Sequence, residues 1–189
     1  QGDIAERPTE VDKSGPGGTK CALPAIVCSD EANCRSVCNQ GEASWPSCSP
    51  NVVDPGSVQE IKNPTGVLGT GQKAVPELVT ALVKAGAAAA SQGYTIKVTS
   101  SYRPLKRQIQ IVCQKIRAGE GSEIGSAVAK PGGSNHGSGR AIDVQLLRGS
   151  QVLVCSGCYK AQRSAQYHEP SQILLKIMSD AGFKRYGKE

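Results

Sequence analysis

Aromatic residues, histidine and long apolar runs are all scarce in this chain of 189 residues. Phenylalanine, tryptophan and tyrosine together make up 4% of it, so the core has to be built mainly from aliphatic side chains. No apolar run approaches the roughly 20 residues that a spanning helix needs, and we expect no membrane span. The net charge of +6 is spread along the chain, without the basic stripe and interleaved aromatic residues typical of nucleic-acid binding. We therefore expect no nucleic-acid partner.

Cysteine, in contrast, is abundant, with eight residues: Cys21, Cys28, Cys34, Cys38, Cys48, Cys113, Cys155 and Cys158. An even number in loop-rich surroundings is typical of disulfide bonds, and hence of a secreted or otherwise extracytoplasmic protein. Five of them precede residue 50, so at least one bond has to join the N-terminal segment to the rest if all pair within the chain. The alternative is a structural zinc site, for which Cys155-x2-Cys158 has suitable spacing and Cys34-x3-Cys38 is the candidate second pair.

The composition divides the chain into three parts. Residues 1–20 are polar and rich in glycine and proline, and we expect a flexible arm. Residues 21–73 hold five cysteines with little periodic pattern, which indicates a cysteine-rich N-terminal segment. Regular patterns begin near residue 74 and predict a domain over residues 74–189. No signal peptide is present, so we expect the chain to be a mature form.

Helical and strand patterns alternate irregularly in this third part. Apolar residues at helical spacing predict helices over residues 76–92 and 104–118 and after Pro170. Alternating and β-branched residues predict strands over residues 94–99 and 140–147. A loop rich in glycine and serine, residues 119–139, separates the second helix from the second strand, and loops of this length are often functional. We expect an α+β fold with a central antiparallel sheet and flanking helices, plus the disulfide-rich N-terminal segment.

The loop ends in Ser134-Asn-His-Gly-Ser-Gly-Arg-Ala-Ile-Asp143, which holds one of only two histidines. His136 lies among small residues, seven positions before Asp143 in an apolar run. Imidazole and carboxylate both bind Zn2+, and a catalytic zinc takes three protein ligands and leaves a fourth position for water. The glycines around His136 let the backbone approach a metal where a Cβ would clash. The pair is a candidate for two ligands of one metal. The alternative is an exposed histidine and an aspartate in a cap or an ion pair.

Two further stretches accompany this motif. Thr99-Ser-Ser-Tyr102-Arg103, followed by Gln108, precedes it, and Gly182-Phe183-x-x-Tyr186-x-x-Glu189 follows it. Together the three stretches resemble, in matching order, the motifs S-x-Y-R, S-x-H-x-x-G-x-A-x-D and E-x-W-H. These motifs belong to the zinc D-alanyl-D-alanine carboxypeptidases and dipeptidases, the vancomycin-resistance type of metallopeptidase. The resemblance covers about residues 74–189 and implies a fold shared with lysostaphin and hedgehog proteins.

The resemblance implies a metal, Zn2+, and a catalytic machinery. His136 and Asp143 would bind the zinc ion, which would polarise a water molecule. Glu189 would act as the general base, and Arg103 would stabilise the oxyanion that develops on the scissile carbonyl. Without the motif, Arg103 could equally be a surface residue.

Three further residues are candidates for substrate binding on the same resemblance: Ser134, Gln108 and Tyr102. Ser134 could position the peptide through its hydroxyl group or simply shape its turn. Gln108 could contact the substrate, although orienting Arg103 or the long loop is the more direct use of a glutamine at this position.

The chain departs from the family at its end. In the family a histidine three residues after the glutamate is the third zinc ligand, whereas this sequence stops at Glu189. We expect a sequence truncated at its C-terminus, since a natural terminus directly before a ligand would be a coincidence; the alternative is a two-ligand remnant. As written, the polypeptide is expected to be inactive or poorly metallated. The other histidine, His168, precedes a predicted helix and is expected to be a loop or capping residue.

The resemblance therefore implies a secreted zinc metallopeptidase that cleaves peptidoglycan stem peptides, most directly a D-Ala-D-Ala carboxypeptidase. Two alternatives stay open. The first is an endopeptidase of the same family, which cuts within the stem or the cross-bridge. The second is a catalytically silent module that binds the cell wall or a protein partner through the cysteine-rich segment.

Overall fold

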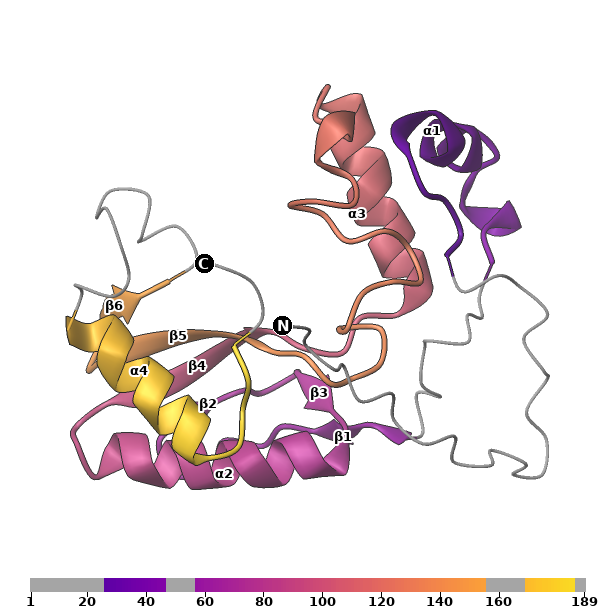
Figure 1. Cartoon of the computed structure of the whole chain (residues 1–189). Coiled ribbons are helices and arrows are strands. Elements are labelled where there is room, and N and C mark those ends of the chain that lie inside the picture. Colours follow the sequence, from indigo (N-terminus) through magenta and orange to yellow (C-terminus); the bar gives the residue numbers. More distant parts are fainter. Residues whose placement is uncertain (1–25, 47–56, 156–168, 186–189) are drawn as a thin grey trace, which may run out of the picture.

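A computed structural model of the chain describes residues 26–46, 57–155 and 169–185. The predicted flexible arm, His168 and Glu189 lie outside these ranges. Within them the chain forms a body of sheet and helices and a second, smaller group of helices beside it (Figure 1).

A four-stranded sheet lies at the centre of the larger body, in the order β2-β4-β5-β6 (Figure 1). Its strands are β2 (Val67–Leu68), β4 (Thr95–Ser100), β5 (Asp143–Arg148) and β6 (Gln151–Val154). Strands β4, β5 and β6 pair antiparallel, and β2 lies parallel to β4. Two shorter strands, β1 (Gln59–Glu60) and β3 (Lys73–Ala74), form a separate antiparallel pair. The predicted α+β fold with an antiparallel sheet is confirmed, with one parallel pair added.

Two helices pack on the same side of this sheet and enclose the main core (Figure 1). Helix α2 (Pro76–Ala90) starts at a proline, which suits the first helical turn, and α4 is Glu169–Asp180. Aliphatic side chains from the helices and the strands are buried between them: Leu82, Ile96, Leu146, Leu174 and Ile177. Burying each such side chain contributes about 1.5–3 kcal/mol, so a core with few aromatic rings is sufficient here.

Helix α3 (Leu105–Arg117) extends away from the sheet and packs against α1 (Glu31–Asn39) (Figure 1). One disulfide, Cys38–Cys113, joins these two helices, and a second, Cys28–Cys34, closes the approach to α1. Cys38–Cys113 joins the N-terminal segment to the rest of the chain, as the cysteine count requires of at least one disulfide. Because Cys34 and Cys38 belong to different disulfides, they are not available as the second pair of a structural zinc site.

The loop of residues 119–139 returns from the far end of α3 to the sheet (Figure 1). It contains one 3-10 turn, Gly121–Glu123, and it is followed by β5, which begins at Asp143 rather than at the predicted residue 140. The last pair between β4 and β5 is Ser100 with Asp143, and a register shift precedes it. The strand therefore starts at the candidate metal ligand. No helix in the described ranges is long and apolar enough to cross a membrane.

Candidate active site

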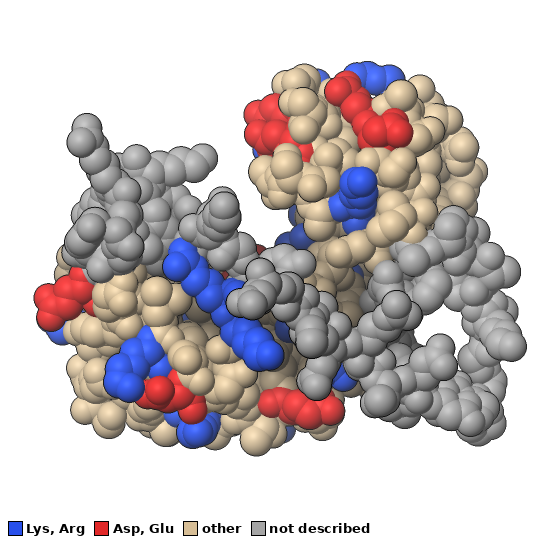
Figure 2. All heavy atoms as spheres, viewed as in Figure 1, with Lys and Arg blue, Asp and Glu red and all other residues tan. Residues whose placement is uncertain are grey.

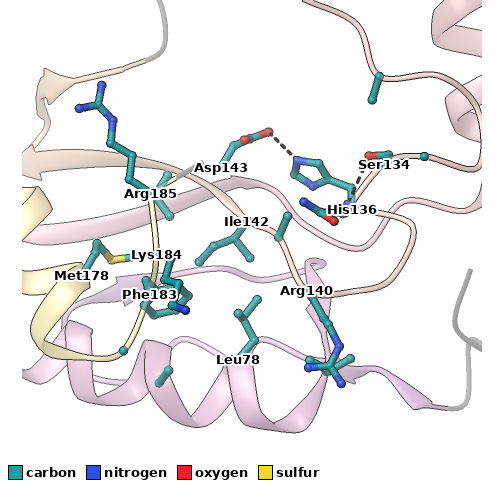
Figure 3. Close-up of a pocket in the computed structure, with 18 of the residues that line it drawn as sticks. Leu78, Ser134, His136, Arg140, Ile142, Asp143, Met178, Phe183, Lys184 and Arg185 are labelled. Atoms are coloured by element: carbon teal, nitrogen blue, oxygen red, sulfur yellow. Dashed lines mark hydrogen bonds and ion pairs between the residues drawn. The ribbon is translucent and has the colours of Figure 1, made fainter. Parts of the chain in front are cut away.

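The structure brings His136 and Asp143 together at the junction of the long loop and β5 (Figure 3). The Nε2 atom of His136 lies 3.5 Å from Oδ2 of Asp143. The imidazole is mostly enclosed, with 15% of its side chain exposed, whereas 56% of the Asp143 side chain is exposed. The histidine is thus fixed by its surroundings while the carboxylate faces open space.

The orientation of His136 is set by the segment that follows β4. Its Nδ1 lies 2.8 Å from the carbonyl oxygen of Ser101, and its own carbonyl accepts the Arg103 N–H at 3.0 Å. A carbonyl oxygen can only accept, so Nδ1 carries a proton in this contact. In the neutral imidazole Nε2 then keeps its lone pair, which is directed towards Asp143. Metal-binding histidines commonly use their second nitrogen in this way.

Ser101 is held in turn by the β3 region. Its hydroxyl oxygen accepts the Lys73 N–H at 2.9 Å and donates to Oε1 of Gln72 at 2.7 Å, and the side chain is buried. Sequence reasoning did not single out Ser101 or Gln72. Ser101 acts on His136 through a backbone carbonyl, and every residue has one, so no side-chain pattern could have indicated it.

Several contacts lower the pKa of the Asp143 carboxyl group below its usual range. The largest is a hydrogen bond from the His136 ring, which Nε2 can donate only when both ring nitrogens carry protons, and burial acts in the opposite direction. The positive charge of Arg103 and a hydrogen bond from Ser100 add to the lowering. Asp143 is therefore a carboxylate near neutral pH, which is the form that binds a cation.

The positions of these two side chains fit a shared zinc ion. Two ligands bonded at about 2.0–2.2 Å to one tetrahedral zinc lie roughly 3.3–3.5 Å apart. The separation of 3.5 Å between Nε2 and Oδ2 matches that requirement before any ion is present. In the described ranges, no third histidine, cysteine or acidic side chain joins them to make a group of three.

Arg103 and Gln108 form a hydrogen-bonded unit behind the pair. Arg103 donates from Nη1 to Oε1 of Gln108 at 2.8 Å and from Nη2 to Oγ of Ser100 at 2.9 Å. Gln108 is buried and donates from Nε2 to the carbonyl of Ala129 at 2.7 Å. Gln108 thus ties α3, the long loop and Arg103 together. Burial lowers the pKa of Arg103, and the charge of Asp143 opposes this, which places the two charges close to one another.

Ser134 and Tyr102 are the other two candidates for substrate binding. The hydroxyl oxygen of Ser134, a buried residue, accepts the N–H of His136 at 3.2 Å (Figure 3). Tyr102 is partly buried, and its backbone N–H donates to the carbonyl of Lys73 at 2.8 Å. Glu189, the predicted general base, lies outside the described residues.

A cleft of about 1340 Å³ opens in front of His136 and Asp143 (Figure 3). Its walls come from the first turns of α2, the long loop, the start of β5, and the end of α4 with the residues that follow it. Ile26, from the N-terminal segment, lines it as well. The space-filling view shows a hollow between the body that carries the sheet and the smaller group of helices (Figure 2). Ser134 is also in the lining, whereas Arg103, Gln108 and Tyr102 are not among the described residues that form it.

Basic side chains outnumber acidic ones in the lining of this cleft. The basic ones are Lys130, Arg140, Lys184 and Arg185, and the acidic ones are Asp143 and Glu77. None of the four basic residues forms an ion pair with another described residue. Unpaired cations beside a partly enclosed site attract an anionic ligand.

Comparison with known proteins gives one family match. The model of the family described as VanY, D-alanyl-D-alanine carboxypeptidase, matches residues 72–189, which is more than half of the chain. No curated protein matches this chain. The matched span includes His136, Asp143, Arg103 and Gln108, the residues whose contacts build the site. The chain therefore belongs to the VanY family of D-alanyl-D-alanine carboxypeptidases.

Proposed function

We propose that this protein is a secreted, zinc-dependent carboxypeptidase that removes the terminal D-alanine from peptidoglycan stem peptides. The observation that carries the proposal is the convergence of His136 and Asp143 on one point of a large cleft. Family membership supports the reaction class, and the distance between Nε2 and Oδ2 suits a zinc ion.

A zinc ion held by His136, Asp143 and a third ligand outside the described residues would supply Lewis acidity to a water molecule and to the scissile carbonyl. The imidazole would need little reorientation to bind it, because the Ser101 carbonyl holds Nδ1 in place. Glu189 would take the proton from the attacking water and pass it to the leaving amine.

Arg103 would add positive potential where negative charge develops on the carbonyl oxygen. Its guanidinium is held in one place by Gln108 and Ser100, so little reorganisation is needed during the reaction. The contacts of Gln108 support a positioning role, since both ends of its amide are engaged within the protein. Ser134 and Tyr102 stay candidates for substrate contact, and Ser134 is the one that lines the cleft.

The charge of the cleft supports cleavage at a chain end. The substrate of a carboxypeptidase carries a free carboxylate directly beside the scissile bond, whereas an endopeptidase substrate carries a peptide bond there. The four basic residues of the cleft lining provide partners for such a carboxylate: Lys130, Arg140, Lys184 and Arg185. The two disulfides support secretion, because bonds of this kind persist in oxidising compartments.

The proposal is tested with protein expressed from the complete reading frame and loaded with Zn2+. The probes are the pentapeptide L-Ala-γ-D-Glu-L-Lys-D-Ala-D-Ala and a cross-linked muropeptide dimer, with products identified by mass spectrometry. We expect release of D-alanine from the pentapeptide, loss of this activity with a chelator, and recovery when zinc is restored. Cleavage of the dimer alone would assign an endopeptidase. Zinc binding without any cleavage would contradict the proposal.

A further inference from the structure

We infer that Ile26, in the cysteine-rich N-terminal segment, is a specificity-determining residue of the cleft. Its side chain contacts a substrate residue beside the scissile bond and limits the size of that residue. The inference rests on the proposed function for the reaction that it tunes. It also assigns part of the substrate site to a segment that lies outside the matched family span.

Ile26 lines the same cleft as His136 and Asp143. It lies against Gly133, three residues before His136, and a Cβ built on Gly133 would come 3.0 Å from Cδ1 of Ile26. A Cβ on Gly133 would require the Ile26 side chain to shift by a few tenths of an ångström. The isoleucine fills the space that this glycine leaves and forms the surface of the cleft at that point.

The wall that contains Ile26 is held firmly. The N–H of the next residue, Val27, donates to the carbonyl of Pro131 at 2.9 Å, which ties the segment to the loop that carries His136. Cys28 is bonded to Cys34 in α1, and α1 is bonded to α3 through Cys38–Cys113. Val27 also packs on a buried apolar cluster with Trp45 and Leu105. Ile26 therefore belongs to a fixed boundary and not to a loose arm.

The chemistry of this wall selects by size and not by charge. Ile26 presents only carbon atoms, and Ala127 and Ala129 of the long loop line the same cleft with single methyl groups. A surface of this kind makes favourable contact with a small apolar side chain such as that of D-alanine. It would disfavour larger side chains because the segment that carries Ile26 is tied to the long loop by the hydrogen bond from Val27 to Pro131.

The first test compares substrates that differ only in side-chain size. Two peptide series replace one or the other of the two terminal D-alanines by D-valine, D-leucine or D-phenylalanine. With Ile26→Ala, we expect the ratio of kcat/KM for a larger residue to that for D-alanine to rise at least about tenfold in one series, a change typical of a reshaped apolar pocket. Ile26→Val should give an intermediate ratio. Ile173→Ala, which removes a partly buried isoleucine of α4 outside this cleft, is the matched control and should leave both ratios unchanged.

The second test measures contact between Ile26 and the peptide independently of cleavage. Protein without added metal, labelled with 13C in the isoleucine δ1-methyl groups, is titrated with the same pentapeptide and followed by NMR. We expect the Ile26 resonance, assigned with Ile26→Val, to shift, while that of the core residue Ile61 stays in place.

The outcomes separate this inference from the proposed function. A shifted Ile26 resonance without any release of D-alanine would remove the proposed reaction and keep Ile26 as a ligand contact. Release of D-alanine with unchanged size ratios would overturn the role of Ile26 and leave the reaction standing, whether or not the resonance shifts. If the Ile26 resonance does not shift and no D-alanine is released, both the inference and the proposed function are overturned.

Discussion

His136 and Asp143, seven residues apart in the sequence, place Nε2 and Oδ2 3.5 Å from each other. A partly buried hydrogen bond to the Ser101 carbonyl orients the imidazole, and the start of β5 positions the carboxylate. The distance would suit two ligands of the proposed zinc ion, and hydrogen bonds within the protein set the orientation of the imidazole.

Replacing either residue should remove the metal. We expect His136→Ala and Asp143→Ala to lower the zinc content of the dialysed protein from about one ion per chain to nearly none, and to abolish release of D-alanine. Metal analysis after dialysis and a D-alanine assay measure the two effects. Asp180→Asn is the control, because Asp180 pairs with Lys176 on the exposed surface of α4. A variant of Asp143 that keeps full zinc content would contradict the ligand assignment.

Arg103 and Gln108 should affect turnover more than substrate binding. We expect Arg103→Ala to lower kcat on the order of 100-fold, the low end of the range for the loss of an oxyanion-stabilising donor. Arg103→Lys keeps the charge but cannot reach Gln108 and Ser100 together, so it should recover only part of the rate.

Gln108→Ala tests whether Gln108 positions Arg103. It leaves the Arg103 guanidinium and the Ala129 carbonyl each without one partner, so we expect a smaller drop in kcat with little change in KM. Because the side chain is buried, unfolding should also become easier by about 1–3 kcal/mol. Steady-state kinetics and thermal unfolding separate the two effects. A change in KM alone would indicate that Gln108 contacts the substrate.

The basic residues after α4 should contribute to substrate affinity. We expect the double substitution Lys184→Glu with Arg185→Glu to raise KM for the pentapeptide about two- to tenfold, in line with weak, solvent-screened charge pairs. The rise should shrink at high salt. Lys97→Glu, an exposed site on β4 outside the cleft, is the matched control and should leave KM unchanged. Equal KM values for both variants at low salt would show that these cations do not contact the substrate.

The two disulfides should differ in their effect on stability. Cys38–Cys113 spans 75 residues and Cys28–Cys34 spans six, so the loop-entropy relation gives losses of about 4 and about 2 kcal/mol when each pair is replaced by serine. Denaturant unfolding of the two double variants provides the comparison. A larger loss for the shorter loop would show that native contacts around Cys28, and not chain entropy, dominate.

Helices α2, α3 and α4, strands β4 and β5, and the pair of candidate ligands could be predicted from the sequence, whereas β1, β2, β3 and β6 were not predicted. Apolar spacing indicated α2, α3 and α4 because each buries one face, and the small residues around His136 indicated a close backbone approach. These features depend on residues that are near one another in the chain.

Other parts of the site could not be predicted, for physical reasons. Helix α1 was missed because its one buried residue is Cys34, and disulfides through Cys34 and Cys38 replace the usual apolar stripe. Its N-cap, Asp30, was the available signal. Ser101 contacts His136 through its backbone carbonyl. The segment that carries Ile26 is held in place by the Cys38–Cys113 disulfide, whose two residues are far apart in the sequence. Neither relationship leaves a pattern in the residue types.

Formation of the Cys38–Cys113 bond depends on an oxidising environment, and this bond bears on how the cleft wall beside Gly133 is assembled. In a reducing environment the N-terminal segment depends on weak contacts alone to stay against the loop of residues 119–139. Once the thiols are oxidised, the Cys38–Cys113 bond holds the segment beside α3, so the same contacts, including that of Ile26 with Gly133, form at a lower entropic cost. The contact of Ile26 with Gly133 would therefore depend on this oxidation, whereas the contacts of His136 with Ser101 and Asp143 would not.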